Sequence, residues 1–97
     1  MEFLEKNSNK VAEALKAIAS PVRLKILRAL SNNRLSAADI RKQVGTSRSN
    51  ITQALIMLKK NEIVASCHNN NKILYKIKKV EILKFIASIE VVFCTKN

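Results

Sequence analysis

Apolar residues recur along this chain at helical spacing, and its first third predicts two amphipathic helices. The first helix begins near Glu2 and carries an apolar stripe formed by Val11, Ala14, Leu15 and Ile18. The second spans residues 22–30, and its apolar stripe of Ile26, Leu27 and Leu30 is expected to face the core. Between the helices, Ser20 and Pro21 are residue types preferred at a helix N-cap and at the first helical position. The chain is therefore expected to open with two helices joined by a tight corner.

A third helix is predicted after Ser36, with Asp39 three residues later in the arrangement of a capping box. Leu35 before the cap and Ile40 within the helix are placed to form a hydrophobic staple. Gly45 is suited to end this helix because glycine readily adopts the left-handed conformation of a helix C-terminus. The third helix is therefore short and is followed by a tight turn.

The fourth predicted helix, residues 47–60, has the most informative pattern in the chain. Thr46 and Ser47 cap it, and its buried stripe contains Ile51, Leu55 and Leu58. The opposite face carries short hydrogen-bonding side chains and a single charge: Arg48, Ser49, Asn50, Thr52 and Gln53. Such side chains, with the hydroxyl of Ser47, can read base edges in the major groove of DNA. A short helix, a glycine turn and this helix together indicate a helix-turn-helix whose recognition helix is residues 47–60.

Residues 63–77 predict a β-hairpin. Two runs rich in β-branched and aromatic residues flank Asn69-Asn70-Asn71, and asparagine tolerates the positive φ of hairpin turns. A hairpin directly after a recognition helix is the wing of a winged helix. Asn70 and Lys72 at its tip are then expected to touch phosphate or the minor groove. An ordinary surface hairpin is the alternative interpretation.

Apolar residues nearly encircle a final predicted helix that runs from Val80 to about Thr95. One small domain cannot bury both sides of a terminal helix, and exposed patches of that size usually mark association. We therefore predict a homodimer sealed by residues 3–19 and 80–95, which presents two recognition helices to a pseudo-palindromic site. The predicted fold class is mainly α with a β-hairpin, a dimeric winged helix-turn-helix with the order α-α-α-α-β-β-α.

The net charge of the chain also indicates DNA as the partner. The 97 residues carry a formal net charge of +11, and 47% of them are hydrophobic, which suits a single domain, residues 1–97, with one core. Residues 41–79 hold nine Lys or Arg but a single acid, Glu62. Double-stranded DNA is the favoured polyanion, and four lysines are candidate phosphate contacts: Lys42, Lys59, Lys60 and Lys72.

Other classes of function receive less support from the sequence. The chain has no apolar run of the roughly 18 residues that span a membrane and no signal-peptide pattern, so we expect no membrane partner and a cytoplasmic location. It has no motif of a nucleophile, metalloenzyme or phosphate loop, so no enzyme activity and no cofactor are predicted. A winged-helix protein-interaction module without specific DNA binding is the alternative function. The nearly uncharged face of residues 48–53 disfavours it, because protein interfaces favour aromatic anchors.

Two cysteines, Cys67 and Cys94, are expected to be reduced in the cytosol. Cys67 precedes His68 on a predicted strand, where adjacent side chains point to opposite faces, so no metal site is predicted there. Both cysteines are candidate thiol sensors, but the favoured interpretation of Cys94 is a small buried core residue.

Three segments resemble the ArsR/SmtB family of winged-helix repressors, in the same order. They are AIASPVRLKILRAL at 17–30, VGTSRSNITQAL at 44–55, and LKKNEIV at 58–64 followed by YKI at 75–77. The resemblance covers nearly the whole chain. It implies a dimeric transcriptional repressor that leaves its operator when an inducer arrives. Inducers in that family include transition metals, arsenite or antimonite, and thiol-modifying species such as persulfides.

The chain also departs from that family's pattern. Residues 34–40 lack the cysteines of the metal box on the third helix, and the last helix has Glu81 and Glu90 but no histidine. Ala54 replaces the usual histidine of the recognition helix. Glu62 replaces the usual glycine before the first wing strand, which makes Asn61 the expected left-handed residue. The resemblance therefore keeps the DNA-binding expectation and removes both familiar metal sites.

Overall fold

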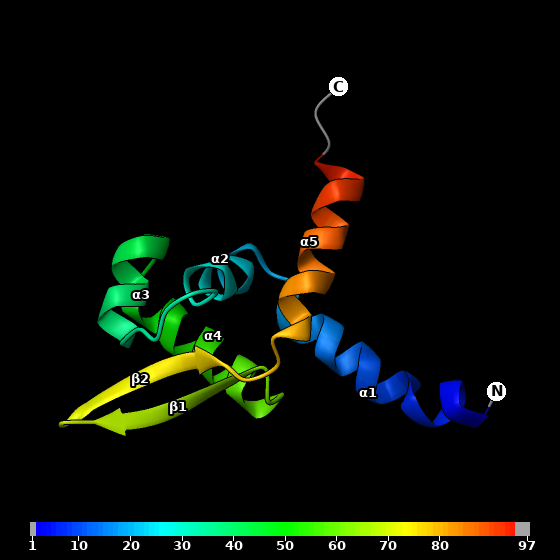
Figure 1. Ribbon diagram of the computed structural model, residues 1–97, viewed down its shortest axis with the longest axis horizontal. Coiled ribbons are helices and arrows are strands. Elements are labelled where there is room, and N and C mark those ends of the chain that lie inside the picture. The colour runs from blue at the N-terminus through cyan, green and yellow to red at the C-terminus, as the bar shows by residue number, and fades with distance from the viewer. Residues whose placement is uncertain (1, 95–97) are drawn as a thin grey trace.

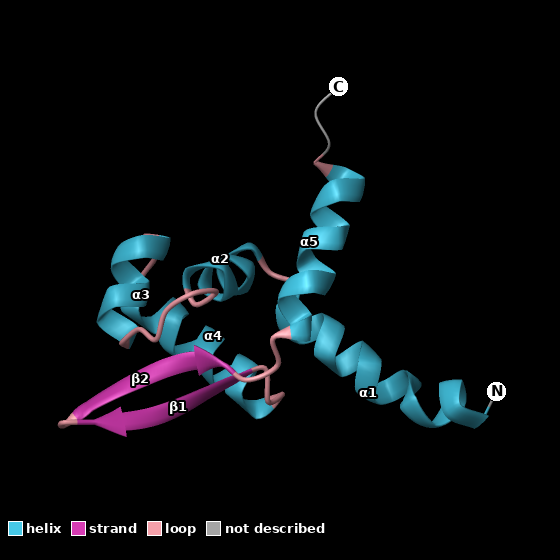
Figure 2. Ribbon diagram, viewed as in Figure 1, coloured by secondary structure: helices cyan, strands magenta, loops and turns pink. Residues whose placement is uncertain are grey.

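The computed structural model describes residues 2–94, with side chains from Asn7 onward, and has the predicted element order. The elements are α1 (Glu2–Ile18), α2 (Pro21–Ala29), α3 (Ala37–Val44), α4 (Arg48–Lys60), β1 (Val64–Asn69), β2 (Lys72–Ile77) and α5 (Glu81–Phe93). Figures 1 and 2 show α2, α3 and α4 grouped beside the hairpin, while α1 and α5 extend away from this group in different directions. The fold is the predicted winged helix-turn-helix.

A fixed corner joins α1 to α2. The Ser20 hydroxyl accepts the Arg23 backbone N–H at 3.3 Å, and Pro21 occupies the first turn of α2, as predicted. The Arg23 guanidinium donates to the carbonyl oxygens of Ala17 at 2.5 Å and Lys16 at 3.1 Å. These carbonyls lie at the C-terminal end of α1, where the helix itself supplies no donors. One arginine of α2 therefore completes the last turn of α1.

The core lies where α2, α3, α4 and the start of β1 meet. It includes all of the predicted stripe of α2 and the buried stripe of α4: Ile26, Leu27, Leu30, Ile51, Leu55 and Leu58. The other core residues are Ala17 and Ile18 of α1, Ile40 of α3, Ala54 of α4, Ile63 and Val64. Of the stripe predicted for α1, Ile18 is buried, whereas Val11 and Leu15 are 53% and 43% exposed. Two of its four residues therefore face solvent in the single chain.

The turn between α3 and α4 follows the predicted chemistry. The Ser36 hydroxyl accepts the Asp39 backbone N–H at 3.1 Å and so caps α3. Gly45 ends that helix in the left-handed conformation with φ 79°, and its N–H donates to Arg41 O at 2.8 Å. Ser47 then caps α4. Both helices of the helix-turn-helix therefore begin at a serine cap.

The hairpin is attached to the helices through its second strand. β1 and β2 are antiparallel, and Asn69 pairs with Lys72, so only Asn70 and Asn71 form the turn, with φ of 49° and 69°. Two left-handed residues in a row are typical of a type I′ turn. At the other end of β2, Tyr75 exchanges backbone hydrogen bonds of 2.8 and 3.1 Å with Leu35, just before α3. The predicted wing is thereby fixed to the helix-turn-helix.

The expected left-handed residue at the end of α4 was wrong by one position. Asn61 has φ −92°, and Glu62 is left-handed with φ 58°. The Asn61 side-chain amide donates to Met57 O at 3.0 Å and so continues the helical end by one residue. The turn therefore falls on Glu62, whose carboxylate accepts a hydrogen bond from Lys78 Nζ at 2.8 Å.

Gly45 provides a test of this turn. Gly45→Ala is expected to lower the free energy of unfolding by about 1 kcal/mol, because a left-handed backbone costs an L-residue roughly that much. An added Cβ meets no atom within 4 Å, so conformation alone sets the loss. Urea unfolding at one fixed protein concentration measures it. Gly45→Asn is the control and should lose less, since asparagine tolerates this conformation. An alanine variant as stable as the parent would contradict the assignment.

Candidate nucleic-acid interface

The outward face of α4 is the candidate reading surface. Ile51, Ala54, Leu55 and Leu58 are buried on one side of the helix. All the residues nominated from the sequence on the other side are exposed: Arg48, Ser49, Asn50, Thr52 and Gln53. The helix contains no acidic residue and ends in Lys59 and Lys60. A surface of this kind offers hydrogen-bond donors and acceptors without repelling phosphate.

The first turn of α4 holds Asn50 by both its backbone and its side chain. The Ser47 hydroxyl accepts the Asn50 backbone N–H at 3.1 Å. Asn50 Nδ2 donates to Thr46 Oγ1 at 2.9 Å, which fixes the orientation of the amide. Among the described residues no hydrogen bond uses the amide oxygen or the second N–H, and these are the groups that pair with adenine. Sequence reasoning gave Thr46 only a capping role and missed this contact, because Thr46 precedes the Ser47 cap and lies outside the helix, where the four-residue pairing rule does not apply.

The candidate phosphate contacts come from three elements. They are Lys42 on α3, Lys59 and Lys60 at the end of α4, and Asn70 and Lys72 at the hairpin tip. All five side chains are exposed. None of the ion pairs between described residues includes any of the four lysines. α3 and β1 both contact α4, so the elements that carry these cations are neighbours of the helix with the reading surface.

Glu62 removes little of this positive charge. The hydrogen bond from Lys78 and the charges of Lys78 and Lys79 lower the pKa of Glu62 below its ordinary value. The carboxylate is therefore ionised at neutral pH, and it is paired with Lys78. Because Glu62 is the one acid of residues 41–79, the nominated lysines keep their charge available to a polyanion.

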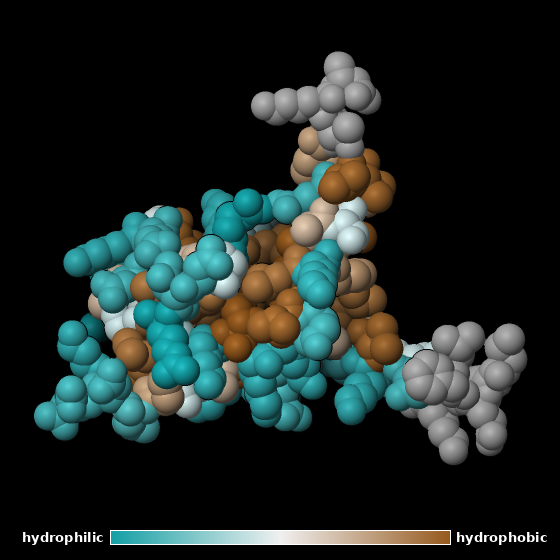
Figure 3. All heavy atoms as spheres, in the orientation of Figure 1, coloured by the Kyte–Doolittle hydropathy of each residue, from teal (hydrophilic) through white to brown (hydrophobic). Residues whose placement is uncertain are grey.

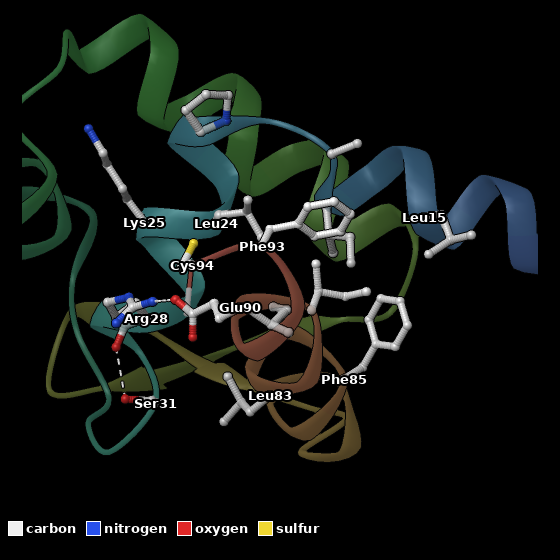
Figure 4. Close-up of a pocket in the computed structure, with 15 residues that line it drawn as sticks. Leu15, Leu24, Lys25, Arg28, Ser31, Leu83, Phe85, Glu90, Phe93 and Cys94 are labelled. Atoms are coloured by element: carbon white, nitrogen blue, oxygen red, sulfur yellow. Dashed lines mark hydrogen bonds and ion pairs between the residues drawn. The ribbon is translucent and has the colours of Figure 1, made fainter. Parts of the chain in front are cut away.

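A second surface, on α5, is apolar. No described residue of α5 is buried, and Phe85, Ile89 and Phe93 are 41%, 42% and 78% exposed. Figure 3 shows apolar side chains gathered in the hollow between α2 and α5. The hollow has a volume of about 790 Å³ and is crossed by the ion pair between Arg28 and Glu90, drawn dashed in Figure 4. Within the described part of the chain, α5 is therefore left uncovered. This is the helix that was predicted to form the homodimer.

Family comparison identifies the chain. The family "Methanogenesis regulatory protein FilR1, N-terminal domain" matches residues 12–90, which include the helix-turn-helix and the hairpin. The chain belongs to this family. The predicted membership of a winged-helix transcriptional regulator family is thereby confirmed.

Several regulators are similar to the chain over most of its length. The biofilm growth-associated repressor of Xylella fastidiosa is 28% identical over 96 residues, covering 99% of this chain and 84% of that protein. The HTH-type transcriptional regulator YgaV of Escherichia coli is 32% identical, covering 94% and 93%. The transcriptional activator HlyU of Vibrio cholerae is 29% identical, covering 100% and 90%.

Solved structures show the same fold. The transcriptional repressor BigR from Xylella fastidiosa superposes with a TM-score of 0.84 at 27% identity, covering 98% of this chain and 97% of that one. The homodimeric winged helix-turn-helix domain Mb0332 from Mycobacterium bovis, described as a possible ArsR-family regulator, has a TM-score of 0.80 at 24% identity. It covers 91% of this chain and 82% of that chain. At 24% identity, the similarity to the Mycobacterium bovis domain shows a shared fold and nothing further.

The structure of this family member places its two cysteines far apart. Cys67 is half-buried on β1 opposite Leu74, and Cys94 is exposed at the end of α5. Figure 1 shows the hairpin and that end of α5 on different sides of the molecule. The interpretation of Cys94 as a buried core residue was wrong for the single chain, because the last turn of α5 extends past the core. Among residues 2–94 no three metal-ligating side chains are grouped, and no helix is long and apolar enough to cross a membrane.

Proposed function

We propose that this chain is a sequence-specific DNA-binding transcriptional repressor that acts as a homodimer in the cytoplasm. The observation that carries the proposal is the exposed, acid-free polar face of α4, held outward by a fully buried apolar stripe. Relatives over nearly the whole chain support it, since all are named as regulators of transcription. One is named a repressor and another an activator. Occupation of an operator is the step that both kinds of regulation require.

Base recognition would use the first two turns of α4. Arg48 can donate two hydrogen bonds to guanine, and the amide of Gln53 or Asn50 can pair with adenine. Ser49 and Thr52 lie on the same exposed face and can donate to or accept from either purine. The Ser47 oxygen caps the helix, but its hydroxyl proton stays available to a phosphate.

Phosphate contacts would hold this helix in register. Lys42, Lys59, Lys60 and Lys72 add affinity without base preference, because every nucleotide carries the same phosphate. The left-handed turn at Asn70 exposes the hairpin tip, where Lys72 and the asparagine amide can meet the backbone or the minor groove. The flanking cations would thus orient a helix that supplies the specificity.

Dimerisation would present two such helices to a pseudo-palindromic operator. The proposed surface is residues 3–19 and 80–95, of which Thr95 and the side chains of residues 3–6 lie outside the described part. Exposed apolar residues on both helices support it, among them Val11, Leu15 and Phe93.

Base specificity can be tested with duplexes that the purified protein selects from a randomised pool. Arg48→Ala and Gln53→Ala should each lose about 1–3 kcal/mol of discrimination at one base pair per half-site, or about 5- to 150-fold. Competition binding against duplexes changed at single positions measures this. Gln43→Ala, an exposed glutamine of α3, is the matched control and should keep the base preferences. Wild-type preferences in both α4 variants would refute this surface.

The phosphate contacts can be tested by salt titration of the same duplex. The logarithm of the binding constant should fall linearly with the logarithm of salt concentration. Lys42→Ala or Lys72→Ala should reduce that slope by about 2 per dimer, at about 0.9 per lost contact. All sequences should weaken equally. Lys25→Ala removes the same charge from α2 and should leave the slope nearly unchanged. Binding that is insensitive to salt would contradict the proposal.

The dimer can be tested on α5. Ile89→Glu places a charge on the exposed apolar face of α5 and should convert the dimer to a monomer in sedimentation analysis. Operator affinity should fall at the same time, because the second half-site is lost. Ser88→Glu adds the same charge at the neighbouring exposed position and serves as the control. An unchanged dimer in Ile89→Glu would exclude this surface.

A further inference from the structure

Ile56 is an apolar residue on the polar outward face of α4. Its side chain is 62% exposed, although the isoleucine at 51 in the same helix is buried. Met57, the other exposed apolar residue of α4, has an intrachain neighbour, since Asn61 Nδ2 lies 3.6 Å from its sulfur. The packing of the core therefore does not account for Ile56.

Helical spacing places Ile56 in the middle of the candidate reading surface. Residues three, four and seven apart share one side of a helix. Ile56 therefore lies in one stripe with Gln53 and Ser49 on its N-terminal side and with Lys60 on its C-terminal side. All four are exposed, whereas Leu55 and Leu58 face the core. Any partner that covers Gln53 closely must also meet Ile56.

The chemistry of the major groove restricts what this side chain can contact. Every base edge there presents donors or acceptors, and thymine alone adds an apolar group, its C5 methyl. Packing an isoleucine against a polar edge would bury an unpaired donor or acceptor, which is unfavourable. We propose that Ile56 packs against a thymine methyl group and so specifies one T·A pair in each half-site. This inference rests on the proposed DNA-binding function and adds a reader that sequence reasoning missed.

The proposal also constrains how α4 enters the groove. Ile56 is eight residues beyond Arg48, which corresponds to about 12 Å along a helix axis. If both side chains reach base edges, α4 lies along the groove and does not enter by its tip alone. At 3.4 Å per base pair, the thymine should lie about three to four pairs from the pair that Arg48 reads.

Thymine-to-uracil replacement tests the contact directly, because uracil lacks only the methyl group. A duplex selected from a randomised pool is prepared with uracil at each thymine in turn, and its affinity is measured by fluorescence anisotropy. Replacement of a single contacted thymine should weaken binding of the wild-type protein about fourfold, the equivalent of one buried methyl group. In Ile56→Ala the same replacement should have no effect, which closes a double-mutant cycle.

Two variants separate this contact from a general effect on α4. Ile56→Val keeps a branched apolar side chain and should retain most of the thymine preference. Met57→Ala truncates the neighbouring exposed residue and should retain all of it. Circular dichroism and sedimentation establish that each variant folds and dimerises as the parent does.

The outcomes distinguish failure of this inference from failure of the proposed function. A wild-type protein that prefers its selected duplex but tolerates uracil at every thymine overturns the role of Ile56 alone. An Ile56→Ala variant that remains as sensitive to uracil as the wild type also overturns it. A wild-type protein with no preference among duplexes overturns the proposed function as well.

Discussion

Packing of the α4 stripe into the core is the constraint on which the rest of the structure depends. Ile51 and Leu58 are almost completely buried against α2, α3 and the start of β1. This contact fixes the rotation of α4, so the face that carries Gln53 must point to solvent. It also places the hairpin, because Ile63 donates its backbone N–H to Leu58 O at 3.0 Å and the strand begins at the next residue. One buried stripe thus positions both the reading helix and the wing.

α2 connects the polar reading surface to the apolar surface of α5. Its buried residues Ile26 and Leu27 pack in the core that supports α4. Its other side presents Leu24 and Arg28 to the hollow beside α5, where Arg28 pairs with Glu90. The two surfaces therefore share one rigid helix, although they differ in chemistry. In the proposed dimer, this helix would transmit the position of α5 to the helix-turn-helix.

Local chemistry made most of the fold predictable. Serine caps at 20, 36 and 47 and the left-handed glycine at 45 each depend on only a few neighbouring residues, and all are found as expected. The turn at 61–62 was misassigned by one position because the Asn61 side chain donates to Met57 O and continues the helical end.

The solvent exposure of individual side chains was harder to predict from the sequence than the secondary structure. Val11 and Leu15 have helical spacing, but which side of α1 meets the core is decided by the corner at Ser20 and Arg23. Ile56 was overlooked because an isolated apolar residue next to a buried stripe is easily assigned to that stripe. Its helical spacing from Ser49 and Gln53 already indicated the outward face, and its exposure in the fold agrees with that position.

The weak attachment of α5 within one chain bears on how two recognition helices would be spaced. No residue of α5 is fully buried; Ile82 and Ile86 pack partly against the core, and Glu90 is tied to Arg28. A helix with so few intrachain contacts takes its final position largely from the surface that covers it. In the proposed dimer that surface is the partner's, so the distance between the two copies of α4 becomes a property of the assembly. Because operator half-sites have a fixed helical spacing, any change that alters the packing of α5 would alter DNA affinity without touching α4. In the proposed dimer, a change at the α5 surface would therefore be enough to alter DNA binding without a metal box on α3.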